Sequence, residues 1–382
     1  MHSYYEFFAG GGMANAGLGS GWRCSFANDF DEAKARAYRA NWGDEHLHVA
    51  DVKSIEPSRL PGQADLAWAS FPCQDLSLAG DYAGLNGQRS GTFWPFWNLM
   101  RSLQREGRGP KSIILENVFG AVTSRGGKDF AAIASAFSGA GYRFGAMIID
   151  ARHFLPQSRP RLFVVGIRGD IEIPSRLISP GPIEIWHPDA LMRAHEGLSA
   201  RAKKLWVWWN LPKPTKTPKR LSDIIEDSPT GVEWHSPEET KYILSLMSKV
   251  HLRKVEEAQK AGRKVVGTIY RRTRPDENGT KRQRAEIRFD EVAGCLRTPS
   301  GGSSRQSIMV VDGRAIRSRL LSPREAARLM GLPDSYKLPT RYNDAYHLAG
   351  DGVAVPVVRH IAKHILEPVL AMENSGLMMA AD

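Results

Sequence analysis

Short apolar runs alternate with longer amphipathic stretches over the first 170 residues of the chain. The short runs are typical of buried strands, and stretches with an apolar residue at every third or fourth position are typical of helices. We expect strands at 4–8, 24–27, 65–70, 112–115, 146–150 and 161–167, and helices at 30–42, 91–104 and 128–140. Strands that alternate with such helices predict a doubly wound α/β domain with a mostly parallel sheet.

This alternation ends after Gly169. Seven prolines lie between residues 174 and 218, and proline interrupts both helices and strand ladders. We expect one charged helix over 237–261, a return of the helical α/β pattern over 322–370, and a frayed end over 372–382. The chain is therefore divided into a first domain at 1–185, a second at 186–318 and a closing segment at 319–382.

Basic residues are concentrated in one part of the chain. The 52 Lys and Arg residues outnumber the 41 Asp and Glu residues, which gives a formal net charge of +11. The window 249–288 contains 13 basic and 5 acidic residues, and so supplies +8 of that charge. Because a concentrated positive patch attracts a polyanion, we favour a nucleic acid as partner over an ordinary solvated basic surface. With 42% hydrophobic and 24% charged residues, the composition also excludes wholesale disorder.

The three cysteines, Cys24, Cys73 and Cys295, are too few and too scattered for a disulfide framework or a closed zinc site. They fit a reducing, cytoplasmic setting. The first ten residues lack the basic and apolar regions of a secretory signal. No apolar run approaches the roughly 18–20 residues that span a bilayer, so we expect no contact with a membrane.

A glycine-rich turn follows the first expected strand, in the sequence EFFAGGGMANAG at 6–17. Glycines let a ligand approach the backbone, and the next helix offers it free N–H groups. The turn is not the dinucleotide fingerprint, because Asn15 stands where the third glycine belongs. Asp29 and Asp51 each follow a later strand, where an acid can bind ribose hydroxyls. Together these positions predict an adenosine-type ligand, although the turn alone also fits a plain tight turn.

Three further motifs place reactive side chains at strand ends. Cys73 in FPCQDLS (71–77) is a candidate thiolate nucleophile, with a small buried residue as the alternative. Glu116 in LENV (115–118) is a candidate acid or base, or simply an acid at a helix N-terminus. Arg159 and Arg161 in PQSRPR (156–161) suit a phosphate or a carbonyl, with surface salt bridges as the alternative.

In this order and combination, the motifs resemble those of the DNA cytosine-5 methyltransferases, particularly the bacterial restriction–modification type. The matching segments are FAGGG (8–12), PCQ (72–74), ENV (116–118), QSRPR (157–161) and RLLSPREAARLMGLPDSY (319–336). The resemblance covers about 1–170 and 290–370. Three features depart from the family pattern: Met13 in place of a glycine, one additional residue near 89–92, and GDGV (350–353) in place of Gly-Asn-Ser-Val.

The resemblance implies a Rossmann-like catalytic domain of the class I S-adenosylmethionine-dependent methyltransferases at 1–185 and a target-recognition domain at 186–318. It also implies that the hinge and C-terminal segment at 319–382 return to the catalytic domain. S-adenosyl-L-methionine is the implied cofactor. The resemblance implies cofactor contacts by Phe8, Gly10 and Gly12 in the turn, by Asp29 at the ribose, and by Phe30 and Asp51 at the adenine. Toward the methionine end it implies Thr92, Phe93, Asp351 and Val353. It also implies contacts by Val52 and Pro72, without a more specific role.

For catalysis, the resemblance implies that Cys73 adds to C6 of a flipped-out cytosine, with Glu116 at N3 and Arg161 at O2. Arg159, backed by Gln157, would support the catalytic loop and its phosphate. Thiolate addition is needed because cytosine C5 is itself a poor nucleophile. The base must leave the stack because its ring is otherwise out of reach.

We expect a monomer whose partner is duplex DNA, and a cognate restriction endonuclease encoded nearby is a candidate second partner. A tRNA cytosine methylase on the same scaffold is one alternative, against which the long basic insert argues. A methylase-derived binding protein without turnover is another. The intact Cys73, Glu116 and Arg161 argue against that alternative, since a pure binder needs no nucleophile.

Overall fold

The computed structural model describes residues 1–72, 92–275, 279–297 and 305–379. The chain divides into two compact units. The first comprises Met1–Asp150, Pro160–Thr215 and Val353–Asp382, and the second comprises Ala151–Arg159 and Lys216–Gly352. Residues 186–215, which the sequence pattern assigns to the second domain, thus belong to the first unit. Within the described ranges, no helix is both long and apolar enough to cross a membrane.

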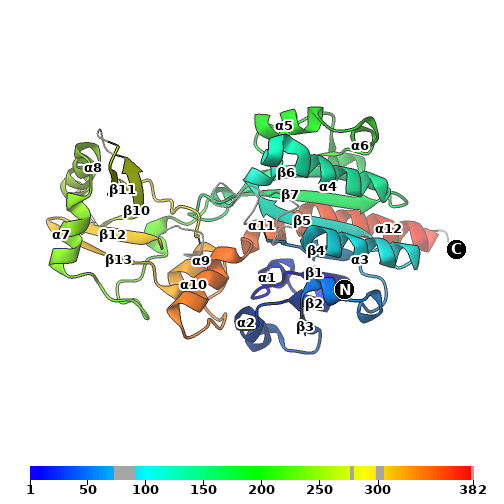
Figure 1. Cartoon of the computed structure of the whole chain (residues 1–382), viewed down its shortest axis with the longest axis horizontal. Helices are drawn as coiled ribbons and strands as arrows, with labels where there is room; N and C mark the ends of the chain where they lie inside the picture. Colours follow the sequence, from blue (N-terminus) through cyan, green and yellow to red (C-terminus); the bar gives the residue numbers. More distant parts are fainter. Residues whose placement is uncertain (73–91, 276–278, 298–304, 380–382) are drawn as a thin grey trace. The chain divides into compact units, whose positions relative to one another are not determined.

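A seven-stranded sheet organises the first unit, in the order β3-β2-β1-β4-β5-β7-β6 (Figure 1). Its strands are β1 (His2–Phe7), β2 (Trp22–Asp29), β3 (Leu47–Val49), β4 (Leu66–Ala69), β5 (Ser112–Val118), β6 (Tyr142–Asp150) and β7 (Pro160–Arg168). Neighbours from β3 to β5 are parallel, whereas β7 is antiparallel to both β5 and β6. The predicted doubly wound α/β domain with a mostly parallel sheet is confirmed.

The strand order changes direction at β1, which lies between β2 and β4. From β1 the chain first builds outward through β2 to β3, and then crosses over to β4 and β5. In open α/β sheets of this kind, ligands bind at the carboxyl ends of the strands beside such a switch point. The ends of β1, β2, β3, β4 and β5 therefore frame the candidate site.

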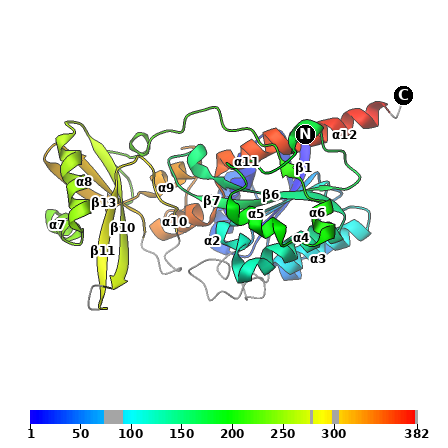
Figure 2. The ribbon, with the colours of Figure 1, turned by 90° about the horizontal axis from the view of Figure 1, so that it is seen from above.

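Helices cover both faces of this sheet, with α3 and α4 on one side and α11 and α12 on the other (Figure 2). The helices of the first unit are α1 (Met13–Leu18), α2 (Glu32–Trp42), α3 (Phe93–Arg105), α4 (Lys128–Gly139), α5 (Asp189–Glu196), α6 (Ala200–Lys204), α11 (Val355–Ile361) and α12 (Glu367–Met379). The buried residues of α3 recur at helical spacing, and they pack with those of the strands into one large apolar core. α11 packs tightly on α1, since a Cβ on Gly17 would overlap the side chain of Val358.

The segment after β7 explains why the first unit continues to Thr215. It holds α5, α6 and the short pair β8 (Ile178–Ser179) and β9 (Trp208–Trp209). Phe144 of β6 donates its N–H to the Leu205 carbonyl at 3.0 Å and accepts from the Val207 N–H at 2.7 Å. These bonds tie the proline-punctuated segment to the β6 edge of the sheet.

The second unit contains a four-stranded antiparallel sheet in the order β11-β10-β12-β13. Its elements are α7 (Pro237–Ser245), α8 (Lys249–Lys260), β10 (Val265–Pro275), β11 (Lys281–Arg288), β12 (Ser307–Asp312), β13 (Ala315–Leu320), α9 (Pro323–Leu329) and α10 (Tyr342–Asp351). Apolar residues of α7 and α8 pack with one face of this sheet into a separate core.

The single helix expected over 237–261 is wrong, because the chain forms α7 and α8 with a break between them. In the break, the Leu246 carbonyl accepts a hydrogen bond at 3.0 Å from the N–H of Ala285 in β11. The backbone there bonds to the edge strand β11 instead of continuing the helix. This interaction joins residues far apart in the sequence, so local periodicity does not reveal it.

Candidate active site

The glycine turn after β1 adopts backbone angles that suit few residues other than glycine. Gly10 and Gly12 have φ values of 56° and 76°, and Phe8 has a φ of 57°. A positive φ in a bulky residue such as Phe8 is strained, and such strain is typically found at functional sites. The turn thus needs glycine at positions 10 and 12 and is held in shape by its surroundings.

Side chains from β2 and α2 hold this turn. The Gly10 N–H donates to Oδ2 of Asp29 at 2.7 Å, and Nε1 of Trp42 donates to the Gly11 carbonyl at 3.0 Å. A Cβ on Gly12 would overlap the indole of Trp42 and lie 3.0 Å from the ring of Tyr38. The backbone of the turn is therefore fixed before any ligand arrives.

Asp29 is buried, with 6% of its surface exposed, at the end of β2. Oδ1 accepts the Asp31 N–H at 2.9 Å, so each carboxylate oxygen already binds a backbone N–H. Burial raises the pKa of Asp29, and Lys34 and these two N–H groups partly offset the rise. The next residue, Phe30, is 71% exposed. A ring this exposed at a strand end is available to stack on a ligand.

Asp51 and Val52 follow β3. The carboxylate of Asp51 is exposed, and it accepts the Lys53 N–H at 2.9 Å at the start of a short 3₁₀ helix. Val52 is buried in the core that also holds Phe26 and Phe71. Asp51 thus presents a carboxylate at the surface beside β2, while the buried side chain of Val52 anchors the backbone in the core.

The end of β5 brings together two of the predicted catalytic residues. Nε of Arg161, at the start of β7, lies 3.3 Å from Oε1 of Glu116, and both side chains are mostly buried. The strand at 112–115 continues as β5 to Val118 because 116–118 pair with the beginning of β7. This register places the carboxylate and the guanidinium side by side at the edge of the sheet where the candidate cofactor residues also lie.

Asn117 connects this pair to the end of β4. Its Nδ2 donates to the Phe71 carbonyl at 3.2 Å, and its Oδ1 accepts the Val118 N–H at 2.8 Å. Phe71 leads to Pro72, the last described residue before Cys73. Cys73 itself lies outside the described residues. The asparagine therefore fixes the point from which the chain departs toward the predicted nucleophile.

Thr92 and Phe93 begin α3. Phe93 is fully buried, with its ring 5.6 Å from that of Phe71 and 5.8 Å from that of Trp97. Packing of Phe93 against Phe71 gives it a structural role in the core below the candidate site, independent of any ligand.

The QSRPR motif divides between the two units, since β7 begins at Pro160. Gln157 is buried in the second unit and donates to the Leu329 carbonyl at 2.6 Å. Arg159, 2% exposed, donates to the carbonyls of Gly350 and Gly352 at 2.8 and 2.7 Å. Arg159 and Arg161 are thus not two guanidinium groups on one strand face, as their spacing suggests. The first arginine shapes the GDGV segment, and the second pairs with Glu116.

Asp351 and Val353 differ in environment. Asp351 is exposed at the end of α10, in the second unit, and Val353 is buried in the first unit. The geometry within each unit assigns neither residue to a ligand.

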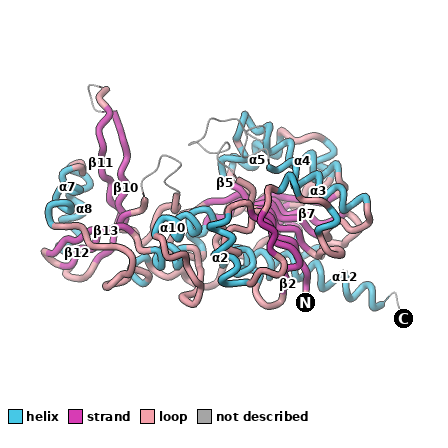
Figure 3. The backbone as a smooth tube through the Cα atoms, turned by 60° about the horizontal axis from the view of Figure 1, so that its bottom comes forward, coloured by secondary structure: helices cyan, strands magenta, loops and turns pink. Residues whose placement is uncertain are grey.

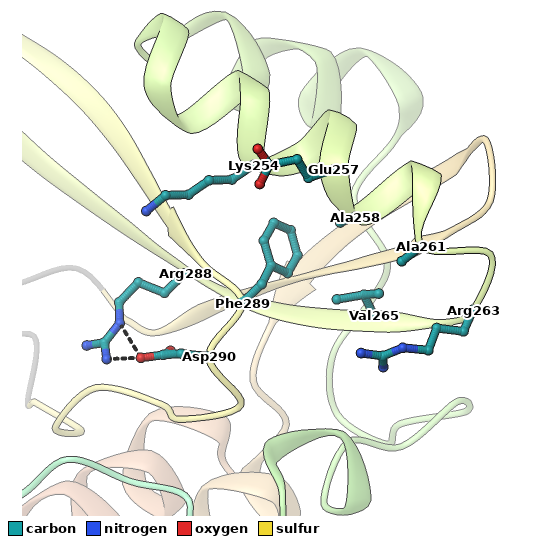
Figure 4. A pocket seen from close by; sticks show the side chains of 9 residues that line it. All are labelled: Lys254, Glu257, Ala258, Ala261, Arg263, Val265, Arg288, Phe289 and Asp290. Atoms are coloured by element: carbon teal, nitrogen blue, oxygen red, sulfur yellow. Dashed lines mark hydrogen bonds and ion pairs between the residues drawn. The ribbon is translucent and has the colours of Figure 1, made fainter.

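A hollow of about 350 Å³ lies between α8 and the base of β11 (Figure 4). Phe289 projects into it beside Ala258 and Val265. Its rim carries charges of both signs, and Arg288 is paired there with Asp290. None of the predicted site residues lines this hollow, so it is separate from the candidate active site.

Two contributors to the site were not predicted as site residues from the sequence. Trp42 ends a helix and contacts the turn from 31 residues away, a relation that spacing alone does not show. Asn117 belongs to the ENV motif, but its bond to Phe71 depends on the parallel pairing of β4 and β5. Knowledge of the strand order would have predicted the second but not the first.

Comparison with known proteins gives a consistent result. The family model described as C-5 cytosine-specific DNA methylase matches residues 3–367. Type II methyltransferase M.HpaII of Haemophilus parainfluenzae is 27% identical over 96% of this chain and 89% of its own length. Type II methyltransferase M.HhaI of Haemophilus parahaemolyticus is 23% identical over 95% of this chain and 93% of its own length.

Solved structures share the fold. The Entamoeba histolytica methyltransferase EhMeth superposes with a TM-score of 0.63 at 14% identity, covering 97% of this chain and 99% of that one. The S. pombe Dnmt2 methyltransferase superposes with a TM-score of 0.57 at 16% identity, covering 96% of this chain and 99% of that one. At these identities the structures support the class I methyltransferase fold alone.

Proposed function

Because the chain belongs to the C-5 cytosine-specific DNA methylase family, we propose that it transfers a methyl group from S-adenosyl-L-methionine to C5 of cytosine in duplex DNA. The observation that carries the proposal is the pairing of Glu116 with Arg161 at 3.3 Å, beside the backbone that leads to Cys73. A carboxyl and a guanidinium arranged in this way complement N3 and O2 of one cytosine ring.

The carboxyl ends of β1, β2 and β3 fit S-adenosylmethionine. The turn at Phe8, Gly10 and Gly12 has the glycines and the fixed backbone that a close ligand requires. The exposed ring of Phe30 supplies a stacking surface, and the exposed carboxylate of Asp51 can accept from an adenine amino group. Asp29 binds two backbone N–H groups, and its remaining lone pairs can accept from ribose hydroxyls.

Cys73 acts as the nucleophile in this proposal. Its thiolate adds to C6 of a cytosine that has left the DNA stack, and this addition makes C5 nucleophilic. Glu116 and Arg161 bind N3 and O2 and stabilise the charge that develops in the ring. When bound, the cofactor supplies an electrophilic methyl group. After C5 has been methylated, a base removes the C5 proton, the Sγ–C6 bond breaks and the thiolate leaves.

Of the other two cysteines, Cys24 is a poor candidate for this chemistry, because burial raises the pKa of its thiol to about 12. Sγ of Cys295 lies 3.2 Å from a guanidinium nitrogen of Arg159 in the second unit.

Arg159 and Gln157 act as positioning residues, since their polar atoms bind backbone carbonyls of the second unit. We assign Thr92, Phe93, Asp351 and Val353 to the methionine end of the cofactor, with Val52 and Pro72 as further cofactor contacts, on the motif match.

The resemblance to Type II methyltransferases supports a sequence-specific enzyme of a restriction–modification system. We infer a cytoplasmic monomer whose partner endonuclease, where present, recognises the same DNA sequence. Lys249–Arg305 would form much of the DNA-recognition surface, in a target-recognition domain within 186–318.

Expression in a host without cytosine methylation, followed by bisulfite sequencing of its DNA, tests the proposed function. Cytosines protected from conversion within one short sequence are the expected result, and that sequence is the recognition site. Cells expressing Cys73→Ala should show complete conversion. Complete conversion with the wild-type protein, or equal protection with Cys73→Ala, would contradict the proposal. A parallel assay on tRNA separates the alternative substrate.

A further inference from the structure

Asn28 is a buried polar residue near the end of β2 that has no role in the proposed mechanism. It is 1% exposed and directly precedes Asp29 and Phe30, two of the proposed cofactor contacts. The strands of the first unit lie side by side in one sheet (Figure 3), in which β2 lies between β1 and β3. Asn28 is paired there with Phe7 of β1 and with His48 of β3. It therefore adjoins the ends of all three strands that carry the proposed adenosine contacts.

The side chain of Asn28 binds the backbone that leads to Asp51. Its Nδ2 donates to the carbonyl oxygens of His48 at 3.0 Å and of Ala50 at 2.8 Å. The N–H of Ala50 in turn donates to the Asp29 carbonyl at 3.0 Å. A carbonyl lies in one plane with the peptide nitrogen that follows it. The bond to the Ala50 carbonyl therefore fixes the peptide group that carries the nitrogen of Asp51.

The backbone of Asn28 holds the glycine turn at the same time. Its carbonyl accepts the N–H of Ala9 at 2.9 Å, and Ala9 lies between Phe8 and Gly10. Any residue at this position supplies that carbonyl, so only the bonds to the end of β3 depend on the side chain. Asparagine suits them because its amide nitrogen carries two N–H groups, enough for two carbonyls.

The other contacts of Asp51 come from the residues that follow it. Its Oδ1 accepts the Lys53 N–H at 2.9 Å, and its carbonyl accepts from Oγ of Ser54 at 2.8 Å. These contacts shape the local turn and move with it. Without the amide of Asn28, the carbonyls of His48 and Ala50 lose a donor in a partly buried setting, which favours movement of this backbone toward water.

We propose that Asn28 is a positioning residue that aligns the Asp51 carboxylate with the 6-amino group of adenine. It acts through the backbone of residues 48–51 and does not touch the ligand. The alignment with adenine rests on the proposed function, which assigns the amino group to Asp51. Loss of the amide should therefore weaken recognition of the amino group more than recognition of the rest of the cofactor. A purely structural residue would affect both alike.

The test measures the affinity of the protein for two ligands by isothermal titration calorimetry. One is S-adenosylhomocysteine, the cofactor without its transferable methyl group, and the other is its analogue with hydrogen in place of the 6-amino group. A hydrogen bond to a charged group changes affinity by a factor of roughly 10 to 150, so the wild type should prefer the amino ligand by a factor in this range. Asn28→Ala should lower that preference by a factor of about 2 to 13, the range for loss of a neutral hydrogen bond. Its Kd for the analogue should stay near the wild-type value.

Two further variants calibrate the comparison. Asp51→Ala should abolish the preference for the amino ligand. Gln104→Ala is the matched control, because Nε2 of Gln104 also donates to a backbone carbonyl of another segment, that of Ala140 at 2.8 Å. Gln104 lies near the end of α3 that is remote from Thr92, so its variant should keep the wild-type preference. Asn28→Ser retains one hydroxyl donor and should fall between the wild type and Asn28→Ala, and it gives the same comparison where the alanine variant does not fold.

An unchanged preference in Asn28→Ala, or an equal loss of affinity for both ligands, would overturn the role given to Asn28. If Asp51→Ala loses the preference in the same series, the proposed cofactor contact of Asp51 stands and only the role of Asn28 is wrong. A wild type that binds both ligands equally, or binds neither, would overturn the role of Asn28 together with the proposed contact of Asp51.

Discussion

The glycine turn after β1 is held by side chains that come from other parts of the first unit. Trp42 binds the Gly11 carbonyl, and Asp29 binds the Gly10 N–H. Below the turn, Glu6 is fully buried, and its Oε2 has no hydrogen-bond partner among the described residues. The sequence motif predicts where the turn lies, but the residues that fix its shape follow from the fold.

Trp42→Phe removes one hydrogen bond while keeping most of the aromatic contact with Gly12. A hydrogen bond of this kind contributes about 0.5–1.5 kcal/mol, so the Kd for S-adenosylmethionine should rise by a factor of about 2 to 13. Because Trp42 acts through the turn, kcat at saturating cofactor should stay near the wild-type value. Isothermal titration calorimetry and steady-state kinetics check both. An unchanged Kd would show that the turn keeps its shape without the indole N–H.

Glu6→Gln should change how stability depends on pH. Burial raises the pKa of Glu6 from 4.5 to about 8, while the N–H groups of Asn15 and Ala14 partly oppose the rise. Between these values the folded protein holds a proton that the unfolded chain releases, so the wild type loses stability as pH rises through this window. The loss is on the order of a few kcal/mol.

The glutamine variant has no such proton to lose. Its unfolding free energy relative to the wild type, measured in urea at several pH values, should therefore increase between about pH 5 and pH 8. A difference that stays constant over this range would show that Glu6 is ionised in the folded protein.

At the scale of elements, the sequence predicts what local periodicity determines. The buried runs and amphipathic stretches locate β1, β5 and α3 because their periods arise from one strand or one helix. The division of 237–261 into α7 and α8 depends instead on the bond between Leu246 and Ala285. Likewise, the spacing of Arg159 and Arg161 does not show that β7 begins between them.

Glu325→Gln tests the anchor at the start of α9. Arg319 and Glu325 are completely buried and form two hydrogen bonds of 2.6 and 2.7 Å. Loss of the carboxylate leaves a buried guanidinium unpaired, which should reduce the unfolding free energy of the second unit by about 3–5 kcal/mol. Chemical denaturation followed by tryptophan fluorescence measures this change.

The control is Asp334→Asn. It breaks the ion pair between Arg328 and Asp334, whose side chain is 63% exposed. An exposed pair contributes at most about 1 kcal/mol. The unfolding free energy of this variant should therefore stay close to that of the wild type. Equal losses in the two variants would contradict the role given to the buried pair.

For the whole molecule, the proposed adenosine-binding residues and the basic window fall on separate units. The predicted cofactor residues at the ends of β1, β2 and β3 belong to the first unit, and the basic window 249–288 belongs to the second. Substitutions in the basic window should therefore alter DNA affinity without altering the Kd for the cofactor. Binding of both ligands still does not establish catalysis, which requires a nucleophile that attacks the base.

The most direct test of that claim uses duplex DNA with 5-fluorocytosine at the target position, incubated with the protein and S-adenosylmethionine. The fluorine is not lost as a proton would be, so the covalent intermediate persists. The wild type should form an adduct that is stable in denaturant and that mass spectrometry locates at Cys73, while Cys73→Ala binds the duplex but forms none. An adduct at Cys24 or Cys295, or no adduct with a duplex that the protein binds, would contradict the account.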